Sequence, residues 1–307
     1  MELHQVEAFL AVHRTGGFSN AATMLHLSQS AVSRRIAMLE ETLGVALFDR
    51  ERDGVHLTSA GACLLPHALA ITAATRDAVE AVRTHVHPAQ VSLRLAMVGT
   101  LASTDLAQSF ITFRREHPDN RLVLRTARSA EVSQLVLASE AHLGLRYFPD
   151  PNPDLVWIPC REEALVVICA PHANLPKDEN LTAKDLVGIP WITFPLGSSG
   201  EPFAESIKLL LRRNGLMGGD WIVIDSLTAQ KRMVEAGFGI SLVPITSIEE
   251  EVRLGSLRIL PIPELESTIP VVLVKRKNLP DNAAISALEQ HILASEPNWD
   301  THKKPHP

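Results

Sequence analysis

The chain has 307 residues, 46% of them hydrophobic, and a formal net charge of −6. This length and apolar content predict about two domains with a substantial buried core. No apolar run reaches the roughly 18 residues of a membrane span, and segment 1–17 lacks the basic start of a signal peptide. We therefore expect a cytoplasmic protein without a membrane partner.

Between Phe18 and Thr58 the sequence predicts two short helices, a tight turn between them, and then an arginine-bearing hairpin. Ser19 and Ser28 are placed to cap these helices, because a serine at a helix start accepts a backbone N–H. Gly44 is placed to end the second helix in the left-handed conformation. The second helix also carries a stripe at helical spacing that we expect to be buried: Val32, Ile36, Leu39 and Leu43.

The other face of the second helix carries short polar groups and a cation. Its residues are Gln29, Ser30, Ser33 and Arg34, with Ser28 at the helix start. A helix that enters the DNA major groove needs such side chains: Gln pairs with adenine, Arg with guanine, and Ser with bases or phosphate. The segment therefore predicts a recognition helix.

Several elements in this order carry a resemblance to a known family. They are Leu3, Val6, Phe9 and Leu10 in the opening helix, Ala21-Ala22, the run from Ser28 to Ser33, Leu39-Glu40, Leu43-Gly44, the run from Leu47 to Arg50, and the run from Leu57 to Gly61. The pattern resembles the winged helix-turn-helix of LysR-type transcriptional regulators. The resemblance implies that the polar face of the recognition helix contacts bases and adjoining phosphates, and that Arg50 and Arg52 in the wing reach the backbone or minor groove. The alternative is an interaction module of this shape that binds no DNA.

The N-terminal segment is less basic than a DNA-binding domain is expected to be. Residues 1–61 hold five arginines, no lysine and seven acidic residues. The arginines mostly gather in the recognition helix and wing, so the local potential favours phosphate although the total does not. We expect affinity to depend on dimer or tetramer avidity more than on non-specific attraction.

Residues 59–88 predict a long linker helix after the DNA-binding domain 1–58. An apolar seam recurs at intervals of three or four residues, as in a two-stranded coiled coil: Leu64, Ala68, Ile71, Thr75, Ala78, Val82 and Val86. Pro66 is expected to kink or interrupt the first turns. The resemblance implies that two chains dimerise through this helix, and that effector-domain contacts then form a homotetramer.

Residues 89–300 predict an α/β effector domain, followed by a tail, 301–307. Strand-like runs alternate with helical ones, which is typical of βαβ units on a parallel sheet. The predicted strands are 92–98, 121–126, 142–147, 164–170, 191–194, 221–224, 239–243 and 271–275, and the helices are 102–117, 130–139, 201–213, 227–236, 247–254 and 283–293. Two lobes (about 89–161 with 268–300, and 162–267) resemble the periplasmic-binding-protein fold that the family uses for its effector domain.

Ligands of open parallel sheets bind beyond the carboxyl ends of the strands, so residues that follow the predicted strands are candidate effector contacts. They are Thr100, Ser103, Arg128, Ser129 and Arg146 in the first lobe, and Leu196, Glu201, Phe203, Asp225 and Phe238 in the second. Two arginines and two helix starts favour a ligand carboxylate, while the acidic pair leaves room for an amine or hydroxyl. For each single residue an ordinary turn or cap is the alternative.

Cysteine and histidine spacings predict no disulfide framework, metal site or cofactor. Some members of the resembled family sense oxidants through a cysteine pair, which leaves a role open for Cys160 and Cys169. An inert buried thiol is the alternative for Cys169, because it lies in an apolar strand.

The leading interpretation is a DNA-binding transcriptional regulator whose promoter contacts change with a small-molecule effector, with RNA polymerase as a further candidate partner. A regulator switched by redox chemistry or by partners is the second. An enzyme with a docking domain is the third, but the α/β half shows no G-x-S-x-G, G-x-G-x-x-G or P-loop motif. The operator, the effector and the sign of regulation stay open.

Overall fold

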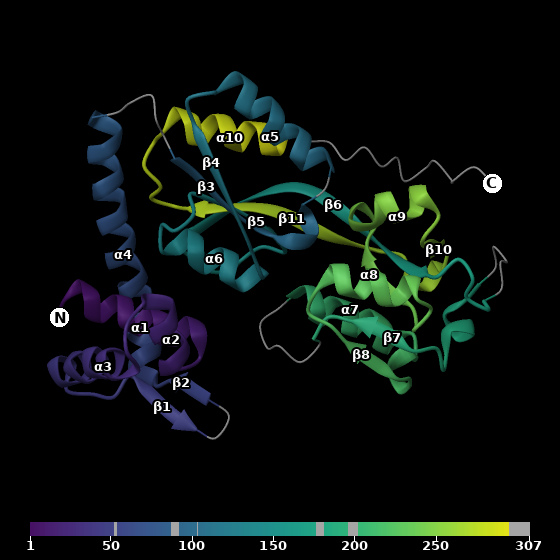
Figure 1. The fold of residues 1–307 in the computed structure, drawn as a ribbon, viewed down its shortest axis with the longest axis horizontal. Helices are drawn as coiled ribbons and strands as arrows, with labels where there is room; N and C mark the ends of the chain where they lie inside the picture. The colour runs from purple at the N-terminus through teal and green to yellow at the C-terminus, as the bar shows by residue number, and fades with distance from the viewer. Residues whose placement is uncertain (52–53, 87–91, 103, 176–180, 196–201, 295–307) are drawn as a thin grey trace. The chain divides into compact units, whose positions relative to one another are not determined.

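In the computed structural model, residues 1–51, 54–86, 92–102, 104–175, 181–195 and 202–294 are described. The chain divides into two units (Figure 1). The first contains residues 1–90 together with the turn Leu137–Ala141, and the second contains the rest. The sequence had placed that turn inside the first effector lobe, so its grouping with the N-terminal unit is a feature of the folded chain alone.

The N-terminal unit is a winged helix-turn-helix followed by a long helix. Its elements are α1 (Leu3–Thr15), α2 (Phe18–Leu25), α3 (Gln29–Leu43), β1 (Phe48–Glu51), β2 (Gly54–Leu57) and α4 (Ser59–Val86). β1 and β2 pair antiparallel, with Phe48 opposite Leu57 and Glu51 opposite Gly54. The hairpin is the predicted wing.

Helix caps in this unit agree with two of the three predictions. The Ser28 hydroxyl accepts the Ala31 N–H at 3.2 Å, and Gly44 ends α3 with φ 70°. Ser19 caps nothing, because α2 begins at Phe18 and its N-cap is Gly17. The Phe18 side chain is buried, so the helix starts two residues earlier than a Ser19 cap would place it, which brings this ring into the core.

Three phenylalanines join the helices to the wing. Phe9 of α1 and Phe48 of β1 have ring centroids 5.3 Å apart, and Phe18 lies 6.1 Å from Phe48, edge to face. Such pairs stabilise beyond the area they bury. The stripe of α3 is buried at Val32, Ile36 and Leu39, but Leu43 is exposed. The prediction was wrong there because the last turn of α3 extends past the core.

The end of α3, the wing and the start of α4 are tied by short polar contacts. The Glu40 carboxylate accepts the Leu47 N–H at 2.8 Å. The Thr58 hydroxyl accepts the Gly61 N–H at 3.0 Å and donates to the Ala46 carbonyl at 2.8 Å. A Cβ at Gly61 would lie 2.2 Å from the Leu47 carbonyl oxygen, so only glycine fits there. These contacts give a physical reason for the residue types of the motif.

The two halves of α4 have different surroundings. Near its start, Leu64, Leu65 and Ala68 pack against the core of the N-terminal unit. Further along, the predicted seam is exposed, and Val82 retains 66% of its accessible surface. Pro66 lies inside the helix without interrupting it. The seam residues Thr75, Ala78, Val82 and Val86 are thus exposed within the described chain.

The second unit is built on a seven-stranded sheet with the strand order β10-β6-β11-β5-β3-β4, where β9 also pairs with β6. The bounds are β3 Ser92–Val98, β4 Arg121–Ala127, β5 Leu143–Tyr147, β6 Leu155–Cys169, β9 Ser241–Pro244, β10 Arg258–Leu260 and β11 Ser267–Arg276. β3 is parallel to β4 and β5, but β11 runs antiparallel to β5 and β6. The sheet is therefore mixed, and the predicted parallel pairing holds only in part.

Helices cover this sheet on both faces in the first lobe. α5 (Thr104–Glu116) and α10 (Ala283–Leu293) lie side by side on one face, and α6 (Ser129–Leu137) lies on the other (Figure 1). The second lobe adds the parallel pair β7 (Trp191–Thr193) and β8 (Trp221–Val223), with α7 (Pro202–Arg213), α8 (Leu227–Glu235) and α9 (Glu249–Leu254). The predicted fold class is confirmed.

Two long strands cross between the lobes. The predicted strand 164–170 is the second half of β6, which already begins at Leu155. β11 begins at Ser267, four residues before the predicted start, and pairs with β6 over most of its length. Both strands were predicted too short because polar and proline residues, such as Glu162 and Pro270, interrupt their apolar runs. β10 was not predicted at all.

Within the described part of the chain, no helix combines the length and the apolar character that a membrane crossing requires.

Candidate functional site

The first candidate site is the exposed face of α3. Ser28, Gln29, Ser30 and Arg34 are exposed and Ser33 is half-buried. The Ser28 hydroxyl is occupied by the cap and by the Ser30 hydroxyl at 3.0 Å. The side chains of Gln29 and Arg34 have no hydrogen-bond partner among the described residues. Their donors and acceptors are thus free for a ligand.

The wing carries the other predicted DNA contacts. Arg50 lies in β1 opposite Val55, and the placement of its side chain is outside what the structure describes. Arg52, in the turn of the hairpin, also lies outside the described residues. The backbone of the hairpin alone therefore supports the wing assignment.

The second candidate site is a cavity of about 920 Å³ in the effector unit. It opens where β3, β4 and β5 end and where α6, α7 and α8 begin, as expected for an open α/β sheet. Its lining is Val98, Gly99, Thr100, Thr126, Ala127, Arg128, Ser129, Glu131, Tyr147, Phe194, Pro195, Phe203, Ala204, Asp225, Ser226, Leu227 and Thr228. The volume is in the range of pockets that hold small molecules, roughly 300–1,000 Å³.

An aromatic wall crosses the cavity from one lobe to the other. The ring of Tyr147 stacks on Phe203 with centroids 5.0 Å apart, and Phe194 meets Phe203 edge to face at 5.8 Å. The Thr100 hydroxyl donates to the Tyr147 oxygen at 2.9 Å. Burial and then the nearby Glu163 carboxylate raise the pKa of Tyr147 well above its usual value. The phenol therefore keeps its proton and remains a donor.

Charged and polar groups face this wall. Arg128 is exposed and its side chain has no partner among the described residues. It immediately precedes α6, whose first residue Ser129 is buried. The Ser226 hydroxyl caps α8 by accepting the Ala229 N–H at 3.4 Å, with Asp225 beside it. A helix start with an adjacent arginine attracts anions. The cavity thus combines an apolar side with one anion-binding corner.

The predicted effector residues divide into three groups. Five line the cavity: Thr100, Arg128, Ser129, Phe203 and Asp225. Three lie outside the described residues: Ser103, Leu196 and Glu201. The structure does not bring the remaining two, Arg146 and Phe238, to the described lining. Phe238 is exposed on the surface.

Arg146 belongs to a buried polar network and is a correction to the sequence-based site. It is 3% exposed, donates to the Ser133 hydroxyl at 2.6 Å and forms a short ion pair with Asp150. Its neighbour Tyr147 faces the cavity, and adjacent strand residues point to opposite faces. Arg146 therefore points toward α6, away from the cavity.

Some lining residues were missed from the sequence, notably Thr126, Glu131 and Tyr147. Tyr147 is the single tyrosine of the chain and ends a predicted strand, which was a usable signal. Glu131 is paired with Arg125 at 2.9 Å. Nothing in the local sequence of Thr126 distinguishes it from other strand residues.

Cys160 and Cys169 lack the environment of reactive thiols. Burial raises the pKa of both Cys160 and Cys169, in spite of lowering contributions from nearby arginines. A higher pKa means less thiolate and slower oxidation. Among the described residues, no group of three or more His, Cys, Asp or Glu side chains is arranged to hold a metal ion.

Comparison with known families decides what kind of protein this is. Residues 3–62 match the bacterial regulatory helix-turn-helix proteins of the lysR family, and residues 87–296 match the LysR substrate binding domain. The chain belongs to the LysR family. This LysR-family protein is a DNA-binding transcriptional regulator with an effector-binding domain, and its relatives are regulators rather than enzymes.

Relatives span nearly the whole chain. The uncharacterised HTH-type transcriptional regulator YusT of Bacillus subtilis (strain 168) is 30% identical over 278 residues, covering 91% of this chain and 90% of its own. The uncharacterised regulator YeiE of Escherichia coli (strain K12) is 29% identical over 279 residues, covering 90% and 92%. The match therefore extends through both domains of the LysR-family regulator.

Solved structures share the fold. Full-length CbnR in complex with its target DNA gives a TM-score of 0.55 at 24% identity, covering 96% of this chain and 99% of that chain. A full-length OxyR variant from Pseudomonas aeruginosa gives 0.62 at 18% identity, covering 99% of both. At these identities the likeness shows the fold alone.

Replacing Arg146 with alanine is expected to destabilise the effector unit. The change leaves the Asp150 carboxylate partly buried without its cation, which typically costs about 3–5 kcal/mol. Chemical denaturation followed by tryptophan fluorescence measures the loss. Arg253→Ala, which breaks the exposed pair with Glu250, is the control and should cost no more than about 1 kcal/mol.

The same pair makes this stability depend on pH. Burial alone would raise the pKa of Asp150, but hydrogen bonds from Ser133 and the Asn152 N–H and the charge of Arg146 lower it overall. A carboxyl whose pKa is lower in the folded state stabilises above the unfolded value, about 3.9. That contribution is lost as the pH falls through the folded value. An acid profile unchanged by Arg146→Ala would contradict this account.

Proposed function

We propose that this LysR-family regulator binds two half-sites of promoter DNA in the cytoplasm as a dimer of dimers. In this proposal a small carboxylate in the effector cavity changes that binding. The observation that carries the proposal is the cavity itself: Arg128 and the start of α6 provide the anion-binding corner, opposite an aromatic wall. RNA polymerase is the proposed partner once the regulator is on the promoter.

The exposed face of α3 is the proposed base-reading surface. Gln29 and Arg34 are exposed and free of partners among the described residues, and Ser33 lies half-buried on the same face. In the wing, Arg50 and Arg52 supply the proposed backbone or minor-groove contacts. Ser28 and Ser30 sit at the helix start, where hydroxyls and free N–H groups suit a phosphate.

The exposed half of α4 is the proposed dimer seam. Thr75, Ala78, Val82 and Val86 recur at coiled-coil spacing and are exposed in the single chain. Exposed apolar residues at this spacing favour a second copy of the same helix as their partner. Two chains held in this way present two recognition helices, as two half-sites require.

The proposed effector is a carboxylate with an apolar body of about ring size. Its carboxylate meets Arg128 and the N–H groups at the start of α6, and each charge-assisted hydrogen bond contributes roughly 1.5–3 kcal/mol. Its body packs on the wall formed by Tyr147, Phe203 and Phe194. Asp225 remains available to accept from an amine or hydroxyl of the same molecule.

Changes on the recognition face are expected to relax sequence preference. Gln29→Ala and Ser33→Ala should each lower discrimination between a selected site and random DNA, by about 1–3 kcal/mol per lost base contact. Arg50→Ala should instead weaken binding to both and reduce the salt slope. Fluorescence anisotropy with both duplexes at several salt concentrations measures this. Thr42→Ala, at the far end of α3, is the control. Parent-like binding by Gln29→Ala, Ser33→Ala and Arg50→Ala would refute the recognition-helix proposal.

A charge in the seam is expected to separate the dimer. Val82→Glu places an unpaired charge in the proposed helix interface, at a cost of about 3–5 kcal/mol, so sedimentation at micromolar concentration should show smaller species than the parent. Ala81→Glu adds the same charge at an exposed position outside the seam and should leave assembly unchanged. Equal behaviour of the two variants would place the interface elsewhere.

Loss of Arg128 is expected to remove carboxylate selectivity. Carboxylates from a metabolite panel that raise the melting temperature would be titrated calorimetrically, each beside its neutral carboxamide. Arg128→Gln should weaken the acid by roughly 10–150-fold, the equivalent of about 1.5–3 kcal/mol, and should leave the amide nearly unaffected. Arg121→Gln, at the opposite end of β4 from Arg128, is the control. Unchanged acid affinity in Arg128→Gln would place the anion site elsewhere.

A further inference from the structure

The turn Leu137–Ala141 is part of the N-terminal unit, although the chain enters it from α6 and leaves it into β5, both elements of the effector unit. Ser139 in this turn has φ 57°, a left-handed conformation that non-glycine residues rarely adopt, and its side chain is buried. Strain of this kind persists only where surrounding contacts hold it. The turn is therefore a fixed part of the N-terminal unit.

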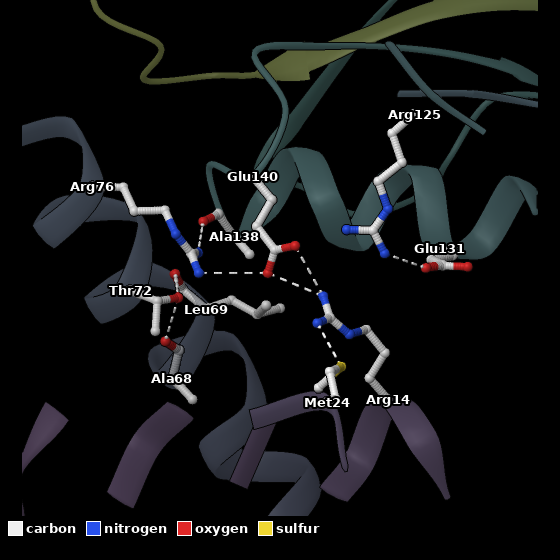
Figure 2. Close-up of polar contacts among 10 residues, drawn as sticks. All are labelled: Arg14, Met24, Ala68, Leu69, Thr72, Arg76, Arg125, Glu131, Ala138 and Glu140. Atoms are coloured by element: carbon white, nitrogen blue, oxygen red, sulfur yellow. Dashed lines mark hydrogen bonds and ion pairs between the residues drawn. The ribbon is translucent and has the colours of Figure 1, made fainter. Parts of the chain in front are cut away.

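Polar contacts to α1 and α4 hold the turn in place (Figure 2). Arg14 of α1 donates from Nη1 to both carboxylate oxygens of Glu140, each at 3.0 Å. Arg76 of α4 donates to the same carboxylate at 3.5 Å and, through Nη1, to the Ala138 carbonyl oxygen. The Ser139 hydroxyl donates to Asp77 of α4 at 2.6 Å. We call these residues and their contacts the turn cluster.

The turn cluster also reaches the helix-turn-helix motif. Arg14 Nη2 lies 3.0 Å from the Met24 sulfur of α2, so a single guanidinium contacts both Glu140 and the helix that precedes the recognition helix (Figure 2). Arg14 and Glu140 are about three-quarters buried, at 24% and 23% side-chain exposure. Partial burial weakens solvent screening and makes such a pair more than an ordinary surface contact.

The elements on either side of the turn lead directly to the cavity. Ser129 and Glu131 line it from the first turn of α6, and Tyr147 lines it from the last residue of β5. Gly144 of β5 packs tightly under α6: a Cβ there would lie 2.7 Å from Val132 and 2.9 Å from Val136. Close packing of this kind transmits displacement and does not absorb it. α6, the turn and β5 thus form one stiff segment with the cavity at one end and the turn cluster at the other.

We propose that this segment, residues 129–147, couples the effector cavity to the DNA-binding helices, with Glu140 as the residue that joins them. Because Arg14 and Arg76 hold the turn, a shift of α6 and β5 at the cavity is passed through the Glu140 carboxylate to these two arginines, and so alters the position of α1 and α2. Because coupling between two sites is reciprocal, DNA bound to α3 must act back on the same segment. The coupling goes beyond the proposed effector chemistry and does not depend on which molecule fills the cavity.

Hydrogen exchange of the full-length protein tests the coupling without any small molecule. The probe is a duplex that the protein itself selects from random DNA, added to saturation. In the parent, the duplex should change the exchange rates of amides in residues 129–147 by roughly fivefold or more, the lower end of allosteric coupling. In Glu140→Gln, which keeps the shape of the side chain and removes its charge, this change should be lost while the duplex still binds.

Two further variants separate coupling from simple stabilisation. Glu250→Gln removes the same charge from the exposed pair with Arg253 and should respond to DNA like the parent. The double variant Arg14→Gln with Glu140→Gln should show the same DNA-induced exchange change as Glu140→Gln alone, because the contact between Arg14 and Glu140 that carries the coupling is already lost in the single variant. Three outcomes would overturn the proposal. The parent could show no DNA-induced change in the exchange rates of residues 129–147, the Glu140→Gln variant could keep that change, or the two substitutions could have additive effects in the double variant.

Discussion

The effector unit depends on the pairing of two long strands, β6 with β11. They run antiparallel to each other from Ser267 opposite Leu165 to Arg276 opposite Leu155, and they connect the two lobes. Each strand contributes to the first lobe at one end and to the second at the other, because β5 pairs with β11 while β9 and β10 pair with β6. A cavity between lobes joined in this way can open and close by bending two strands, without breaking either lobe's core. The buried Glu163, hydrogen-bonded by Thr246, lies on β6 near the point of crossing.

Local signals in the sequence were sufficient for most of the fold. Ser28 was predicted as a cap because a serine directly before an apolar helical repeat can accept a backbone N–H of the first turn. Gly44 was predicted as the helix end because a helix that ends in the left-handed conformation favours glycine. Failures occurred where tertiary contacts decide: α2 starts at Phe18 because that ring packs on Phe48, and Leu43 lies beyond the core it was expected to enter. The strand β10 has three residues, too few to show a period.

The sequence predicted where the candidate site lies in the fold, but it predicted only some of the residues that line it. Strand ends gave Thr100, Arg128, Phe203 and Asp225, since topology brings such ends together at one edge. The prediction for Arg146 was wrong because position along a strand does not decide which face a side chain occupies: side chains alternate across the sheet, and Arg146 lies on the face opposite Tyr147. β5 is buried on both faces, and the face opposite the cavity is covered by α6, whose Ser133 receives Arg146. An arginine next to a strand end is thus as readily a structural cation as a ligand contact.

The turn cluster changes how the weak basicity of the DNA-binding unit should be understood. Residues 1–61 contain five arginines and seven acidic residues. The Arg14 side chain is already hydrogen-bonded to the Glu140 carboxylate. The cations left for phosphate are therefore those of α3 and the wing, Arg34 and Arg35 and then Arg50 and Arg52. Affinity for random DNA grows with the number of phosphates neutralised, so we expect one such unit to hold DNA weakly at physiological salt. In the proposed dimer, tight binding then depends on two recognition helices at the correct separation. In this proposal, DNA affinity depends on the geometry of the dimer more than on its charge. A small displacement of α1 and α2 can then change that affinity.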